Sequence, residues 1–196
     1  VNFQLSDAAY SFIRGHRLRI AISTTYWPMI WPSPEPVELT LHTQNSSIEL
    51  PVRPSRGGPK LTPFLSAEEG SPMPATILSA GASENRVSRD VLSGRVEVLS
   101  ERGGDKVVIE EHGLEVGGRK TIERMSITEG DPLSAETEMT VGNHVKRDGF
   151  DVEVKARTHL TSTEDDFLLT ADLDVYESKS RVLSKRWSVA IPRRGI

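Results

Sequence analysis

The fold class is indicated most clearly by one stretch near the end of the chain, FDVEVKARTHL, which covers residues 150–160. Apolar residues recur there at every second position, as in Phe150, Val152 and Val154, and mostly charged residues lie between them. Successive side chains of a β-strand point to opposite faces of the sheet. This period of two therefore predicts a strand with one buried face and one solvated face.

The same alternation recurs on both sides of this stretch and predicts an antiparallel meander over residues 86–196. Turns rich in Gly and Asp separate the segments, because Gly tolerates a positive φ and Asp hydrogen-bonds within its own turn. Strands of even spacing joined by short turns are typical of sandwiches and half-barrels. The predicted strands are 95–99, 107–109, 121–127, 136–141, 150–160, 167–175 and 183–191, and the predicted turns include Gly117-Gly118 and Arg147-Asp148-Gly149.

Residues 1–85 have a different character and are expected to form a separate, partial β domain. Alternation predicts three strands there, at 17–23, 37–42 and 47–52. Residues 53–85 are rich in Pro and Gly and show no sustained period. We expect this segment to be an extended arm at the boundary between the two β regions. Whether the two regions form one sandwich or two units is left open.

Composition excludes several classes of protein. The 196 residues carry a net charge of −4 and no dense cluster of Lys or Arg, which argues against a nucleic-acid partner. No apolar run is long enough to span a bilayer, so we expect no membrane partner. The absence of cysteine rules out disulfides and thiolate ligands and leaves the compartment undecided. Because the chain starts at Val1, we expect it to be cut out of a longer protein.

The chain lacks the motifs that catalysis or metal binding would need. A serine hydrolase of the α/β type requires a Gly-x-Ser-x-Gly elbow, and the nearest match, Gly81-Ala82-Ser83-Glu84-Asn85, fails at its last position. The five histidines show no spacing typical of metal ligands. Asp172 and Asp174 share one strand face and are expected to pair with basic residues across the sheet. We therefore predict no catalytic residue, no metal site and no cofactor.

One loop has an excess of apolar and aromatic residues and is the candidate binding site. Tyr26, Trp27 and Trp31 lie in a loop that four prolines keep from forming a strand or a helix. Stiff aromatic loops make good anchors because they lose little entropy on binding. Three interpretations remain open. The loop folds back on its own sandwich, docks on a partner domain or cleft, or binds sugar.

The segment before this loop resembles a known family. Residues 12–24, FIRGHRLRIAIST, are similar to the Gly-His-Arg strand signature in the C-terminal domain of X-Pro dipeptidyl-peptidases and CocE/NonD-type hydrolases. The loop that follows, with Trp27-Pro28 and Trp31-Pro32, resembles the same region of the putative acyl esterases in that family. Softer similarities of order and spacing extend to residues 127–134 and to Trp187 and Ile191-Pro192-Arg193.

The resemblance implies a fold, a partner and a role. Such proteins carry an α/β-hydrolase domain with a Ser-His-Asp triad, followed by a non-catalytic, galactose-binding-like jelly roll. The implied partner is therefore the catalytic domain of the same polypeptide, and the implied role is an accessory domain of a hydrolase. His16 and Arg17 begin the signature strand and are candidates for a structural or interface role. The alternative is a free-standing ligand-binding or carbohydrate-binding module.

The resemblance also shows a departure from the family pattern. In the family several strands precede the Gly-His-Arg strand, whereas only about fifteen residues precede it in this sequence. Open sheet edges pair readily with other chains. We therefore expect the chain to associate with itself as a homo-oligomer.

Overall fold

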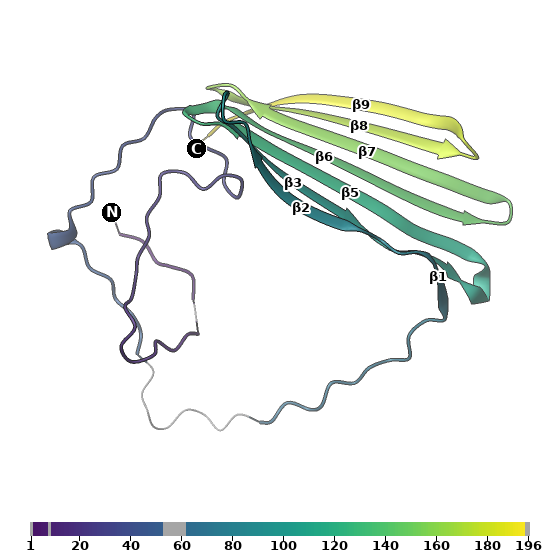
Figure 1. Cartoon of the computed structure of the whole chain (residues 1–196), viewed down its shortest axis with the longest axis horizontal. Helices are drawn as coiled ribbons and strands as arrows, with labels where there is room; N and C mark the ends of the chain where they lie inside the picture. Colours follow the sequence, from purple (N-terminus) through teal and green to yellow (C-terminus); the bar gives the residue numbers. More distant parts are fainter. Residues whose placement is uncertain (1, 8, 53–61, 195–196) are drawn as a thin grey trace.

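A computed structural model describes residues 2–7, 9–52 and 62–194 of the chain (Figure 1). The described part consists of a long N-terminal segment without strands and one open antiparallel sheet. Its helices are two single 3₁₀ turns, η1 at Thr43–Asn45 and η2 at Glu110–His112. The strands are β1 (Ala75–Ser79), β2 (Ser83–Arg89), β3 (Arg95–Gly103), β4 (Lys106–Ile109), β5 (Leu114–Thr128), β6 (Asp131–Arg147), β7 (Phe150–Ser162), β8 (Asp166–Glu177) and β9 (Ser180–Pro192).

The sheet confirms the predicted all-β class and the antiparallel meander. From β5 to β9 each strand pairs with the next one in the sequence, so the order in space follows the order along the chain. The predicted turn at 147–149 connects β6 to β7. Local alternation and turn chemistry are enough to define such a meander, because every strand pairs with its sequence neighbour.

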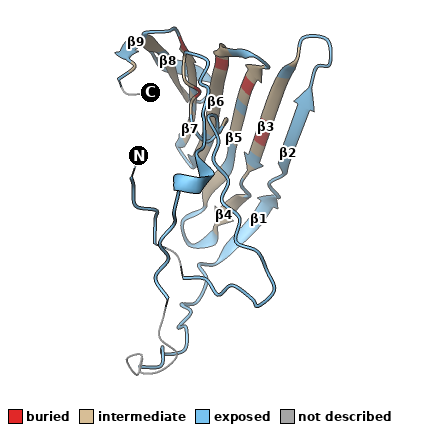
Figure 2. Ribbon diagram, turned by 90° about the vertical axis from the view of Figure 1, so that its left-hand side faces the viewer, coloured by how far each residue is buried: buried red, intermediate tan, exposed pale blue. Residues whose placement is uncertain are grey.

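Strand β5 joins the meander to the other strands. Along one edge it pairs with β6, and along the other edge it pairs with two strands in succession. Its first residues, Leu114–Gly117, pair with β4, and residues 120–128 pair with β3. In turn β4 pairs with β1, and β3 pairs with β2. Figure 2 shows this forked half of the sheet, with β1 and β4 below β2 and β3.

The predicted turn at Gly117-Gly118 is wrong, because the structure places both residues inside β5. Both have positive φ values, +102° and +61°, and the register with β6 shifts between Gly117 and Lys120. The two glycines therefore form a bulge that separates the β4-paired part of β5 from the β3-paired part. A sequence signal for positive φ does not distinguish a bulge within a strand from a turn that reverses the chain.

The prediction of three strands at residues 17–23, 37–42 and 47–52 is also wrong, because the structure has no strand at these positions. A strand needs a neighbour that accepts and donates its backbone hydrogen bonds. The described residues provide no such ladder partner for these segments. Conversely, β1 and the start of β2 lie in the stretch that the sequence predicts to be irregular. The rest of the predicted arm includes residues 53–61, which lie outside the described residues, and the division at residue 85 remains a prediction.

The two faces of the sheet differ sharply in chemistry. We call apolar face the side that carries Val98 of β3, Met125 of β5, Val141 of β6, Val154 of β7, Leu173 of β8 and Val189 of β9, which the register places in neighbouring rows. We call charged face the opposite side, which carries Arg124, Glu138, Arg157, Asp172 and Arg186. Each strand therefore has the one-sided pattern of a sheet that is covered by another layer on one face.

The apolar face is nonetheless open in the structure. Among the apolar residues of the described strands, only Leu99 and Ala135 are buried, at 6% and 1% exposure. Figure 2 shows that the few buried positions are scattered over the central strands and that most of the sheet is intermediate or exposed. Large side chains on the apolar face, such as Trp187 and Val189, are 40% and 48% exposed. The sheet therefore has one face suited to a hydrophobic core, but no second layer of the described chain packs against that face.

We predict that Gly117→Ala weakens the sheet strongly. A Cβ built on Gly117 would lie 2.2 Å from the backbone oxygen of Asp105, and the positive φ adds strain. The free energy of unfolding should fall by about 2 kcal/mol or more, measured by urea denaturation. Gly142→Ala is the matched control, because its Cβ would meet only the Val154 oxygen at 4.0 Å. Equal stability of the two variants would contradict the bulge.

Candidate functional site: the aromatic anchor

The aromatic loop predicted to be a binding site is attached to one end of the sheet. In residues 2–93, so far as they are described, only Trp27, Pro28 and residues 31–34 are half-buried or buried, and all the others are exposed. All of them belong to this loop, and Pro32 is buried. The loop is thus the point at which the N-terminal segment is held to the rest of the molecule. We call this contact the aromatic anchor; it comprises Trp27, Trp31, Ser162, Phe167 and Arg193.

Three aromatic rings form the apolar part of the anchor. Trp31 packs edge-to-face between Trp27 and Phe167, with ring centroids 5.1 Å and 5.6 Å apart. Such T-shaped contacts are the favoured geometry of aromatic pairs. Phe167 lies at the start of β8, on the same face as Leu169 and Leu173. The loop therefore packs on the apolar face, at the end where β7 leads into β8.

Hydrogen bonds fix the same contact. The Trp31 Nε1–H donates to the Ser162 hydroxyl over 3.0 Å. Arg193, just after β9, donates to the Ser162 hydroxyl over 3.2 Å, to the Thr163 carbonyl over 2.9 Å and to the Pro32 carbonyl over 2.6 Å. Its guanidinium also lies 4.9 Å from the Phe167 ring centroid. One side chain thereby ties the loop, the β7–β8 turn and the end of β9 together.

Burial leaves two donors of the anchor without a partner. Trp27 Nε1 and Arg193 Nε are buried and have no hydrogen-bond acceptor among the described residues. Burial also lowers the pKa of the Arg193 guanidinium from its usual value. An unpaired buried donor costs free energy, so each of these two groups is suited to an acceptor supplied from elsewhere.

The structure separates the sequence-predicted site residues into two groups. Trp27 and Trp31 point inward to the anchor, whereas Tyr26 is 65% exposed. Met29 and Ile30 between them are also exposed, at 75% and 58%. His16 and Arg17 are exposed in the N-terminal segment, away from the anchor. The structure thus does not bring His16 and Arg17 together with the aromatic residues.

Three members of the anchor were missed by the sequence analysis as site residues. Ser162, Phe167 and Arg193 lie more than 130 residues after the loop they hold. Phe167 and Ser162 look like ordinary strand residues in the sequence, and Arg193 looks like a residue of the chain end. Only the fold brings them together, and no spacing in the sequence indicates the contact.

The charged face confirms the predicted pairing of Asp172 and Asp174. Arg186 donates two hydrogen bonds to the Asp172 carboxylate, at 2.5 Å and 3.0 Å, and Arg181 lies 3.6 Å from Asp174. These hydrogen bonds lower the pKa of Asp172. On the neighbouring strands Arg157 pairs with Glu138 and lowers its pKa. Asp172, Asp174 and Glu138 of this face are therefore each paired with an arginine within the sheet.

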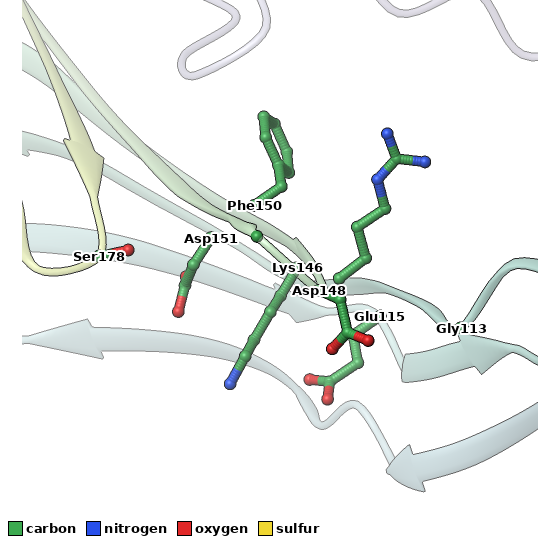
Figure 3. Close-up of a pocket in the computed structure, with 9 residues that line it drawn as sticks. Gly113, Glu115, Lys146, Asp148, Phe150, Asp151 and Ser178 are labelled. Atoms are coloured by element: carbon green, nitrogen blue, oxygen red, sulfur yellow. The ribbon is translucent and has the colours of Figure 1, made fainter.

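A hollow at the far end of the sheet lies among the turns (Figure 3). Lys146 and Asp151 point there to one side of the sheet, and Phe150 points to the side on which the N-terminal segment is drawn. His144 contacts Asp151 over 2.7 Å and lowers the pKa of that carboxyl. The lining residues are Gly113, Glu115, Lys146, Arg147, Asp148, Gly149, Phe150, Asp151 and Ser178. This set contains no nucleophile–base pair and no converging donors.

The described residues contain no group of three or more His, Asp or Glu side chains placed to hold a metal ion. None of the helices found in these residues is long and apolar enough to cross a membrane.

We predict that Trp31→Ala releases the N-terminal segment from the sheet. Limited proteolysis should then cut residues 17–52 at least tenfold faster, because local opening exposes the backbone to the protease. Trp31→Phe keeps a ring against Phe167 but loses the bond to Ser162, so we expect an intermediate rate. Tyr10→Ala, a change at an exposed ring outside the anchor, is the control. If Trp31→Ala is cut no faster than this control, the loop is not the attachment point.

We predict that acid weakens the sheet through the charged face. The pKa values of Asp172 and Glu138 are lowered in the folded chain. Their contribution is therefore present above the unfolded pKa values of about 4 and is lost as the pH falls through the folded values. Urea midpoints at pH 6 and pH 2 should differ less in an Asp172→Asn/Glu138→Gln variant than in the unsubstituted chain. An unchanged difference would contradict this role.

Comparison with known proteins agrees with the resemblance seen in the sequence. No curated protein and no solved structure matches the chain. One family model does match, over residues 1–88, a range that contains the Gly-His-Arg strand signature and the whole aromatic loop. The sheet from β3 to β9 lies outside the matched range. The model that matches is the X-Pro dipeptidyl-peptidase C-terminal non-catalytic domain, so residues 1–88 of this chain are similar to that domain.

Proposed function

We propose that this chain is the non-catalytic accessory region of a serine hydrolase of the acyl esterase or X-Pro dipeptidyl-peptidase type. In this role it packs on an α/β-hydrolase catalytic domain of the same polypeptide and helps to shape the substrate cleft. The observation that carries the proposal is the family match over residues 1–88. A domain described as non-catalytic implies that a catalytic domain lies elsewhere in the same polypeptide.

The chemistry of the chain supports a role without catalysis. Residue types that could act as nucleophile and base are present, but the described residues place no Ser beside a His that is itself oriented by a carboxylate. The closest histidine contacts are those of His144 with Asp151 and of His159 with Glu136, and both lie on the charged face of the sheet. These are contacts of a solvated surface, and they stabilise the sheet only weakly.

The aromatic loop supports a contact with a partner domain. The anchor fixes its inner side, so the outer side, Tyr26, Met29 and Ile30, is held in place before any partner arrives. A pre-ordered apolar surface binds with a smaller entropic cost than a mobile one. Aromatic residues and Met are also enriched at protein interfaces. We therefore assign these three residues to the contact with the catalytic domain.

The alternative of a sugar-binding module fits the loop less well. A sugar platform uses the open face of an aromatic ring, but Trp31 is enclosed edge-to-face by Trp27 and Phe167. This leaves Tyr26 as the exposed ring of the loop. For Trp27 and Trp31 the geometry favours the interpretation that the loop folds back on its own sheet. For Tyr26 it favours docking on a partner domain.

The proposal predicts hydrolysis by the polypeptide that contains the catalytic domain. That protein should cleave short p-nitrophenyl esters, and the chain described here should be inactive on its own. Replacing Tyr26 and Met29 together with Ala should lower kcat/KM about tenfold or more, because an interface hot spot contributes upwards of about 1.4 kcal/mol. Tyr10→Ala is again the control. A well-folded polypeptide that hydrolyses neither esters nor X-Pro peptides would overturn the proposal.

A further inference from the structure

The apolar face of the sheet needs a covering layer. Its rows of Val, Leu and Met side chains run from β3 to β9, and the charged face behind them carries ion pairs such as Arg157–Glu138 and Arg186–Asp172. Each square ångström of apolar surface left in water costs about 25 cal/mol. Sheets of this one-sided kind occur in proteins as half of a sandwich, with a second layer about 10 Å away.

The N-terminal segment has the matching pattern. Residues 17–23, 37–42 and 47–52 each carry three large apolar side chains at alternate positions, and the residues between them are polar except for Ala21 and Pro51. These apolar residues are exposed, with Leu18 at 47% and Leu39 at 51%. The set is Leu18, Ile20, Ile22, Val37, Leu39, Leu41, Ile48, Leu50 and Val52. In an extended conformation each segment is thus amphipathic. Its apolar side is exposed, as is the apolar face of the sheet.

The aromatic anchor already joins these two surfaces. Trp31 lies in the loop between the first and second amphipathic segments and packs on Phe167, a residue of the apolar face. The contact between the N-terminal segment and the apolar face is therefore established at one end of the sheet. Figure 1 shows the segment looping away from the sheet elsewhere and rejoining it at β1. Closure needs only an extension of an existing interface.

The chain is long enough to make this extension. Val37 follows Trp31 by six residues, which span at most about 20 Å when extended. Val189 pairs with Leu169, two residues along β8 from Phe167, which places it about 7 Å from the anchor along the strand direction. Val37 and the residues after it therefore reach the apolar face next to the anchor without strain on the chain.

We propose that residues 17–52 of this chain close over the apolar face as its covering layer, with Trp31 as the fixed point. The apolar side chains at alternate positions then pack against β7, β8 and β9, and the intervening polar side chains, such as Glu38 and Thr40, point to solvent. This inference concerns the two halves of the chain alone. It does not depend on the proposed function, and no catalytic domain takes part in it.

Cysteine cross-linking provides a direct test, because the chain contains no native cysteine. A Val37→Cys/Val189→Cys variant should form a cross-link with a short bismaleimide that runs as a monomer on a denaturing gel. The matched control is Val37→Cys/Ser188→Cys, in which the second cysteine is the adjacent residue of β9 on the charged face. We expect at least tenfold more monomeric cross-link in the first variant than in the control.

Each other outcome of the cross-linking overturns the proposal. A cross-link of dimer size in the first variant would show that a second copy covers the apolar face. Equal cross-linking in the two variants, or none in either, would show that residues 17–52 do not lie on it. Esterase activity is not measured, so failure here is distinct from failure of the proposed function.

Carbene footprinting of the unsubstituted chain gives a second readout that needs no variant. Leu39 and Val189 should be labelled at least about fivefold less than Leu92, since covering protects both of them and not a turn residue. Leu92 is 99% exposed and lies in the turn between β2 and β3, away from the proposed layer. Labelling of Leu39 and Val189 that reaches the level of Leu92 would overturn the proposal.

Discussion

Backbone pairing along β5 is the constraint on which the rest of the sheet depends. This strand is the only route in the described residues by which the β6–β9 meander connects to β1, β2, β3 and β4. It can serve two partners on one edge because Gly117 and Gly118 open a bulge between them. A bulge raises the local twist and bends the strand, so the β1–β4 pair turns away from the β2–β3 pair. Without the two glycines the fork would lose its geometry.

The sheet places its two kinds of chemistry back to back. On one side, rows of opposite charge on neighbouring strands satisfy each other, as Asp172 does with Arg186. Exposed pairs of this kind add little stability each, and their main effect is to keep that face in water. On the other side apolar residues predominate, although Glu123 and Lys185 also lie there, and the aromatic anchor is the one place in the described chain where the N-terminal segment packs on it. The asymmetry of the sheet thus decides which side the other parts of the protein contact.

The sequence could predict the elements whose partners are their neighbours along the chain. The strands from β5 to β9 follow from alternation at positions such as Val152 and Leu173, together with Gly and Asp in the turns. It could not predict that β5 is shared by β3 and β4, because the two glycines read equally as a turn or a bulge. It also could not predict that residues 17–52 lack strands. Alternation at Leu18 and Ile20 shows which side of a strand would be apolar. A strand forms, however, only where a neighbouring segment provides partners for its backbone hydrogen bonds.

The candidate site shows the same limit, and Arg193 shows why it matters. Sequence reasoning found the loop from its own residues, since Trp27 and Trp31 are conspicuous in a proline-rich segment. What the loop does depends on a residue 161 positions after Pro32 that donates to the Pro32 carbonyl. With that contact in place, Trp27 and Trp31 face the sheet and Tyr26 faces outward. The inner side of the loop therefore attaches the N-terminal segment to the sheet, and the outer side offers a surface that is held in place. An accessory domain requires this combination, because a surface can position a catalytic neighbour only if it is itself held in place.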